Sequence, residues 1–71
     1  MGWIIHREMS SEEDGEMEGY MTQYGNFGVR SEAYVYDSYE EAEEEAENAE
    51  GWLVQEFPED WNMLSAIEVD D

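Results

Sequence analysis

The densest chemistry in this sequence is a run of carboxylates in its second half. Seven glutamates fall between positions 40 and 50 with no Lys or Arg among them, namely Glu40, Glu41, Glu43, Glu44, Glu45, Glu47 and Glu50. On a helix, like charges four residues apart repel by about 0.2–0.5 kcal/mol per pair, so an ordinary surface helix mixes the two signs. Carboxylates without local counterions attract cations, and the chemistry open to this run is therefore the binding of a positively charged partner.

A second acidic run lies nearer the N-terminus. Positions 9–18 (MSSEEDGEME) are polar and interrupted by Gly15, a pattern that predicts a loop. The two runs together supply the candidate partner-binding residues. These are Glu40, Glu41, Glu43, Glu44, Glu47, Glu12, Glu13, Asp14, Glu16 and Glu18.

Catalytic and metal-binding chemistry has little support in the sequence. Aligning Gly15 with the glycine of an EF-hand calcium loop puts Ser10 at the first position and Met21 at the last, where Asp and Glu are needed. His6 is the single histidine and cysteine is absent, so neither a zinc site nor a nucleophilic catalytic group can be assembled. The sequence therefore predicts no enzyme, no cofactor and no specific metal site.

The charge balance limits the partners. The 71 residues include 21 Asp and Glu, two Arg and no Lys, which gives a formal net charge of −19. Binding of nucleic acid or of an anionic membrane depends on Lys and Arg, so neither is expected to bind directly. The first apolar-leaning run, Met1 to Ile5, is far too short for a signal peptide or a membrane span, and we expect a cytoplasmic protein.

The chain is nevertheless expected to fold as a single domain covering residues 1–71, because 41% of it is hydrophobic and 14% aromatic. Strands are predicted at Trp3–Arg7, Gly19–Tyr24 and Ala33–Tyr36, with the glycines between Gly25 and Gly28 forming a hairpin turn. On the third strand Tyr34 and Tyr36 share one face.

The acidic run itself is predicted to be a helix. Ser38 with Glu41 three residues later matches a capping box, and Tyr39, Ala42, Ala46 and Ala49 form a narrow stripe at helical spacing. Gly51 is placed to end this helix near Ala49.

A last strand is predicted after the helix, at Trp52–Phe57, and is stopped by Pro58. The signals from Glu59 to Val69 are mixed between helix and strand. The predicted fold is α+β, a small antiparallel sheet of about four strands backed by one helix in the order β-β-β-α-β, with a C-terminal extension of uncertain structure.

Two resemblances bear on function. Positions 33–42 (AYVYDSYEEA), followed by positions 52–57 (WLVQEF), resemble a pattern common in very small phage and bacterial proteins, which implies a curved sheet backed by one helix. Small size, extreme acidity, absence of lysine and many aromatic residues also resemble phage DNA-mimic proteins, among them anti-CRISPR and anti-restriction proteins and uracil-DNA glycosylase inhibitors. That second resemblance is one of composition and transfers no individual residue.

The leading hypothesis is a DNA-mimic inhibitor that occupies the basic nucleic-acid-binding surface of a CRISPR effector, restriction enzyme or repair enzyme, in the host cytoplasm if the protein is phage-encoded. Seven carboxylates over roughly 15 Å of helix lie about 2 Å apart along the axis, against about 1.7 Å per charge in duplex DNA. A plain solvated helix face explains the same run. A domain adapted to molar salt, or an acidic adaptor or chaperone for a basic protein, also remains open, as does pairing of two chains into a homodimer.

Overall fold

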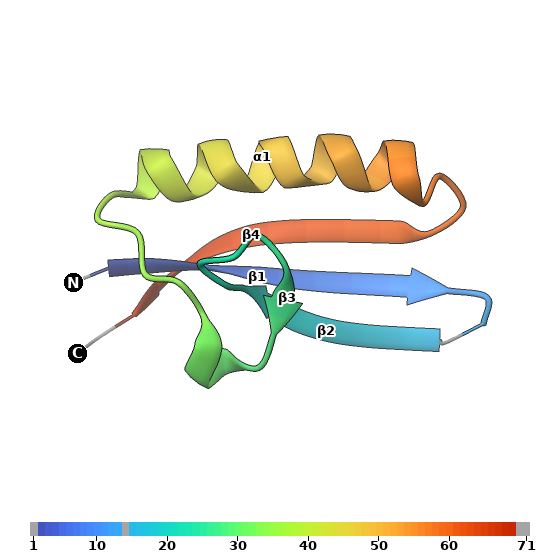
Figure 1. Ribbon diagram of the computed structural model, residues 1–71, viewed down its shortest axis with the longest axis horizontal. Helices are drawn as coiled ribbons and strands as arrows, with labels where there is room; N and C mark the ends of the chain where they lie inside the picture. The colour runs from blue at the N-terminus through green and yellow to red at the C-terminus, as the bar shows by residue number, and fades with distance from the viewer. Residues whose placement is uncertain (1, 14, 70–71) are drawn as a thin grey trace.

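The computed structural model describes residues 2–13 and 15–69 and contains a four-stranded antiparallel sheet with one helix lying across one face (Figure 1). The strands are β1 (Gly2–Ser11), β2 (Gly15–Met21), β3 (Phe27–Gly28) and β4 (Trp61–Val69), arranged in the order β3-β2-β1-β4. The helix α1 spans Tyr39–Glu56, and a 3-10 turn, η1, spans Arg30–Glu32. The predicted α+β class and the order β-β-β-α-β are confirmed.

The first hairpin is longer than predicted, and the loop expected over positions 9–18 is wrong. Strand β1 continues to Ser11 and β2 begins at Gly15, with Glu8 opposite Glu18 and Ser10 opposite Glu16. Gly15 supplies the positive φ, 72°, at the reversal. Acidic residues are tolerated here because alternate side chains of both strands point to the sheet face that α1 does not cover.

The third strand also lies elsewhere. The second strand ends at Met21, and β3 is the two-residue segment Phe27–Gly28 that pairs with it. The predicted strand Ala33–Tyr36 makes only isolated bridges, of which the firmer joins Tyr36 to Trp3 through reciprocal backbone hydrogen bonds of 2.7 and 2.9 Å. Because η1 interrupts the chain just before it, this segment aligns with the sheet at single residues instead of along a ladder.

The helix is the largest correction. Sequence patterning ends it near Ala49 and starts a strand at Trp52, but α1 continues through Gly51 to Glu56, and the predicted strand Trp52–Phe57 is wrong. Leu53, four residues after Ala49, extends the buried stripe and is only 1% exposed. Burial of that side chain outweighs the helix-breaking tendency of one glycine. The fourth strand is instead Trp61–Val69, where the signals were mixed.

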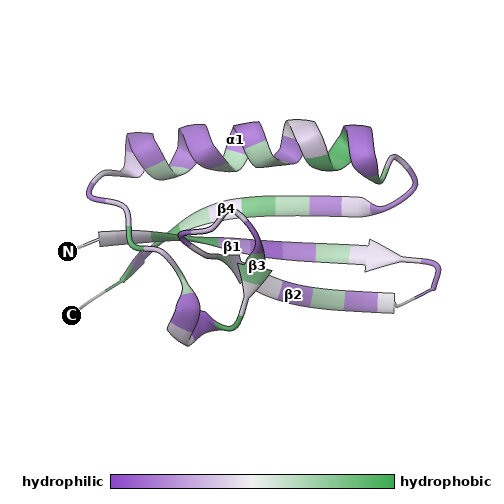
Figure 2. Cartoon of the chain, viewed as in Figure 1, coloured by the Kyte–Doolittle hydropathy of each residue, from purple (hydrophilic) through white to green (hydrophobic). Residues whose placement is uncertain are grey.

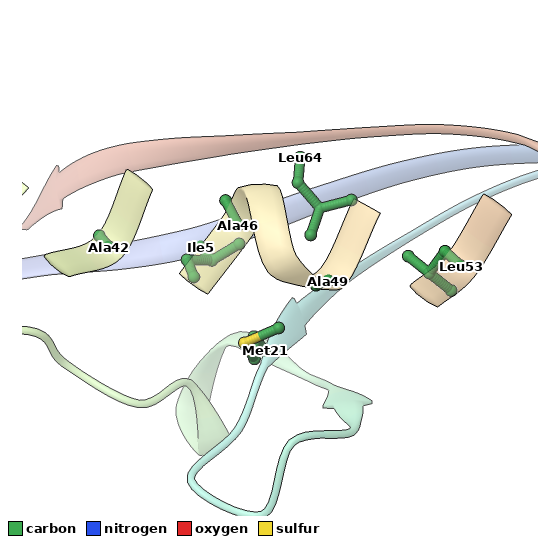
Figure 3. Packing of buried hydrophobic residues seen from close by; sticks show 7 residues of the cluster. All are labelled: Ile5, Met21, Ala42, Ala46, Ala49, Leu53 and Leu64. Carbon is green, nitrogen blue, oxygen red and sulfur yellow. The ribbon is translucent and has the colours of Figure 1, made fainter. Parts of the chain in front are cut away.

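The core forms between α1 and the covered face of the sheet (Figure 3). Its buried members are Ile5, Met21, Ala42, Ala46, Ala49, Leu53 and Leu64. Because the helix stripe is mostly alanine, α1 can lie close to the sheet. The helix start is fixed by the Ser38 hydroxyl, which accepts a hydrogen bond of 3.2 Å from the backbone N–H of Glu41, as the capping pattern predicted.

Across residues 2–13 and 15–69, no helix combines the length and the apolar character needed to cross a membrane.

Candidate functional site

Five of the predicted carboxylates form an exposed surface on the first half of α1, here called the helix ridge. Its residues are Glu40, Glu41, Glu43, Glu44 and Glu47, all exposed. Since successive helix residues rotate by about 100°, Glu40, Glu44 and Glu47 point away from the sheet while Glu41 and Glu43 flank them. Figure 2 shows hydrophilic colouring along this outer side. None of the five takes part in an ion pair with another described residue.

Two glutamates of the same run turn toward the sheet instead. The Glu50 carboxylate accepts a hydrogen bond of 3.1 Å from the backbone N–H of Leu64 in β4 and is partly buried. Glu45 lies near Tyr36, where burial raises the pKa of the tyrosine hydroxyl and the charge of Glu45 raises it further. Glu50 therefore serves local structure, whereas Glu45 stays exposed on the side of α1 nearer Tyr36, and neither is counted in the helix ridge.

The helix ridge stops halfway along α1. The outer positions of the second half carry no charge, and Gly51, Trp52 and Val54 are exposed there. From Glu40 to Glu47 the ridge extends over about 10.5 Å of helix axis, at 1.5 Å per residue. Sequence patterning could not locate this limit, because it placed Trp52 and Val54 in a strand.

A second acidic surface lies at the end of the molecule where the first hairpin turns. The exposed Glu12 and Glu13 of the turn line one shallow depression together with Glu56, Glu59 and Asp60 from the connection between α1 and β4. We call these five residues the acidic end. Both segments lie at the same end of the fold in Figure 1. Asp14, also predicted as a site residue, lies outside the described residues.

The remaining predicted site residues, Glu16 and Glu18, lie on the sheet face away from α1, here called the open face. Their register partners place Glu8 on the same face, with Glu8 and Glu18 directly opposite each other. Glu18 Oε2 lies 3.2 Å from His6 Nε2, the one ion-pair contact within the described part of the chain. The predicted site residues are thus divided among three surfaces.

Both arginines lie against aromatic rings, and neither forms an ion pair with a described residue. The Arg7 guanidinium stacks 4.5 Å from the centre of the Phe27 ring, and its Nε donates a 2.8 Å hydrogen bond to Asn62 Oδ1. Burial lowers the pKa of Arg7, and the charge of Asp60 partly opposes this. Arg30 lies 5.8 Å from the centre of the Tyr20 ring.

The open face also carries apolar side chains that were not among the predicted site residues. Trp61 is 53% exposed and Met63 is 51% exposed, in register with Ser10 and Glu8 of β1. Their alternation with Asn62 and Leu64 is the period-two pattern of a strand with one buried face. That signal would have identified them if the segment had been assigned to a strand.

No protein-family model, curated protein or solved structure matches this chain. Within the described residues, no three His, Asp or Glu side chains are placed to hold a metal ion together.

Proposed function

We propose that this protein is a DNA-mimic inhibitor that occupies the basic nucleic-acid-binding surface of a DNA-processing or defence enzyme. The observation that carries the proposal is the helix ridge, where five exposed carboxylates without an internal cation lie over about 10.5 Å of a rigid helix. That is about one charge per 2 Å, close to the spacing of about 1.7 Å per charge along duplex DNA.

The shape of the protein is compatible with such a role. The molecule extends 36 × 20 × 18 Å along its principal axes, and its long axis is comparable to one helical turn of B-DNA, about 34–36 Å. The helix ridge and the acidic end lie toward opposite ends of α1, so a basic groove that follows the molecule meets negative charge near both ends.

Inhibition would follow from occupancy. A net charge of −19 steers the protein toward a surface rich in Lys and Arg, and association should be fast in dilute buffer and slow in high salt. The partners expected from this chemistry are a CRISPR effector, a restriction enzyme or a repair enzyme, in the host cytoplasm if the protein is phage-encoded. Exposed aromatic side chains such as Trp52 would then favour one target over another.

The test is displacement of a labelled DNA duplex from purified enzymes. The panel consists of a guide-loaded Cas9-type effector, a type II restriction endonuclease and a uracil-DNA glycosylase. We expect the protein to displace the duplex from at least one of them in dilute buffer and to lose this ability as salt rises. If the protein displaces DNA from none of the three enzymes, the result would count against mimicry.

A charge-matched pair of variants separates the helix ridge from bulk charge. One variant changes Glu40, Glu43, Glu44 and Glu47 to Gln, and its control changes the exposed Glu8, Glu32, Glu45 and Glu68, which lie outside the helix ridge and the acidic end, to Gln, so both lose four negative charges. We expect the ridge variant to lose displacement and the control to keep most of it. Equal loss in both would mean that net charge acts and the helix ridge has no special role.

A further inference from the structure

Strand β4 forms a long edge of the sheet, and no other described strand pairs along its outer side. The strand order is β3-β2-β1-β4, so β4 pairs only with β1, whereas the opposite edge is the two-residue strand β3. The outer edge of this nine-residue strand presents backbone donors and acceptors to any extended chain that lies beside it.

The register shows which residues of β4 present those groups. Trp3 exchanges both of its backbone hydrogen bonds with Tyr36, so the backbone groups of Trp3 point away from β4. Trp3 and Glu68, its partner in β4, therefore form a non-hydrogen-bonded pair. Since the pattern alternates, the backbone groups of Asn62, Leu64, Ala66 and Glu68 point outward. The bond from the Leu64 N–H to the Glu50 carboxylate agrees with this direction.

The outer edge is only partly protected. Glu50 covers the Leu64 N–H, and no other bond to the outward groups of β4 is found among residues 2–13 and 15–69. A charged side chain placed against an edge is a common protection against unwanted pairing. Here it leaves the outward groups of Ala66 and Glu68 available.

The surroundings of this edge differ on its two sides. On the open face, β4 presents Trp61 and Met63, each about half exposed, toward its start, and the partly buried Ile67 between Ala66 and Glu68. On the other side lies the flank of α1 that contains Glu50, and Glu43 and Glu47 share that flank because they precede Glu50 by seven and three residues. A strand added beside β4 would have alternate side chains next to apolar groups and next to carboxylates.

We propose that the outer edge of β4 binds an extended segment of a partner protein in which basic residues alternate with apolar ones. Backbone pairing to Ala66 and Glu68 supplies affinity that does not depend on side chains, and the two contrasting flanks select the alternating sequence. The carboxylates identify the partner as cationic. A second copy of this chain is disfavoured at the same edge, because each copy carries a charge of −19. The inference shares a cationic partner and the carboxylates Glu43 and Glu47 with the proposed function, but it concerns the backbone edge of β4 and does not require DNA mimicry.

The probe is a synthetic peptide in which lysine and valine alternate over the length of β4, with a control peptide that groups the same residues into a lysine block and a valine block. We expect the alternating peptide to bind more tightly and to slow hydrogen exchange at the amides of Ala66 and Glu68. Equal binding of the two peptides, or no protection of these amides, would overturn the proposal, because charge attraction alone explains both results.

A proline at position 68 tests the backbone contribution. Glu68→Pro removes an outward-pointing N–H without removing a bond to β1, and Glu68→Gln controls for the lost charge. We expect Glu68→Pro to weaken binding of the alternating peptide by about two- to tenfold relative to Glu68→Gln, as for the loss of one hydrogen bond. Equal affinities of the two variants would refute backbone pairing, and if Glu68→Pro does not fold, amide exchange in the unmodified protein decides.

Two further measurements separate this proposal from its alternatives. Sedimentation of the protein alone should show a monomer, and a dimer disrupted by Glu68→Pro would assign the edge to a second copy and overturn the partner proposed here. Displacement of DNA by Glu68→Pro should equal that of Glu68→Gln, so a failure of the β4 proposal can be distinguished from a failure of the helix ridge.

Discussion

Replacing Gly51 by Ala should stabilise the protein, because the glycine lies inside α1 on its solvent-facing side. Its φ is not positive, and a Cβ built there has no heavy atom within 4 Å. Only the helix preference therefore changes, and it favours Ala over Gly by about 0.8–1.0 kcal/mol in a helix interior. For a domain of this size, that gain raises Tm by about 4–8 °C. Urea denaturation and a thermal melt followed by circular dichroism measure both quantities.

The sign of this change discriminates between two structures. If α1 ended before Gly51, with the glycine in the left-handed conformation of a helix C-terminus, Ala would destabilise the protein by about 1 kcal/mol. Gly25→Ala is the matched control, since Gly25 has a φ of 82° and no atom within 4 Å of a built Cβ. We expect it to lower the free energy of unfolding by about 1–2 kcal/mol. A destabilised Gly51→Ala variant would refute a continuous helix through Glu56.

Two further predictions concern the start of α1 and the partly buried phenol of Tyr36. Ser38→Ala removes the acceptor for the Glu41 N–H and should lower the free energy of unfolding by about 1 kcal/mol. Ser38→Asp should restore that free energy, because Asp also caps helices. Equal urea midpoints for the wild type and Ser38→Ala would contradict the cap. Because the pKa of Tyr36 is raised in the folded state, its contribution to stability is present below pH about 10 and is lost as pH rises through the folded pKa. Tyr36→Phe should therefore reduce the loss of stability in alkaline buffer, measured by urea midpoints, with the exposed Tyr24→Phe as control; an unchanged alkaline loss would show that Tyr36 is not its source.

Local signals were sufficient where one segment determines its own structure. The Ser38 cap and the alanine stripe of α1 act between residues three or four apart, so the sequence displays them directly. The strand at Trp3–Arg7 was likewise found from its β-branched and aromatic residues, although β1 extends further at both ends.

The prediction failed where a distant contact overrode the local signal. Gly51 is a valid stop signal for a helix. However, Leu53, one turn after Ala49, has a buried position against the sheet, and α1 continues past Gly51 to place it there. With α1 extended to Glu56, the fourth strand is Trp61–Val69, which pairs with β1 along its whole length. Positions 9–11 and 15–18 became strand for a similar reason, because one face of the sheet needs no apolar side chains.

The acidic surfaces also depend partly on local sequence and partly on distant contacts. The sequence by itself determined the amount of negative charge and its concentration on one helix, since a net charge of −19 with two arginines leaves most of the carboxylates without an internal cationic partner. Only the tertiary structure decided where each carboxylate points. It turned Glu50 to the edge of β4, brought Glu12 and Glu59 together at the acidic end and placed Glu18 on the open face. These positions depend on how helix and strands pack, which joins residues too far apart in the chain for any local pattern to relate them.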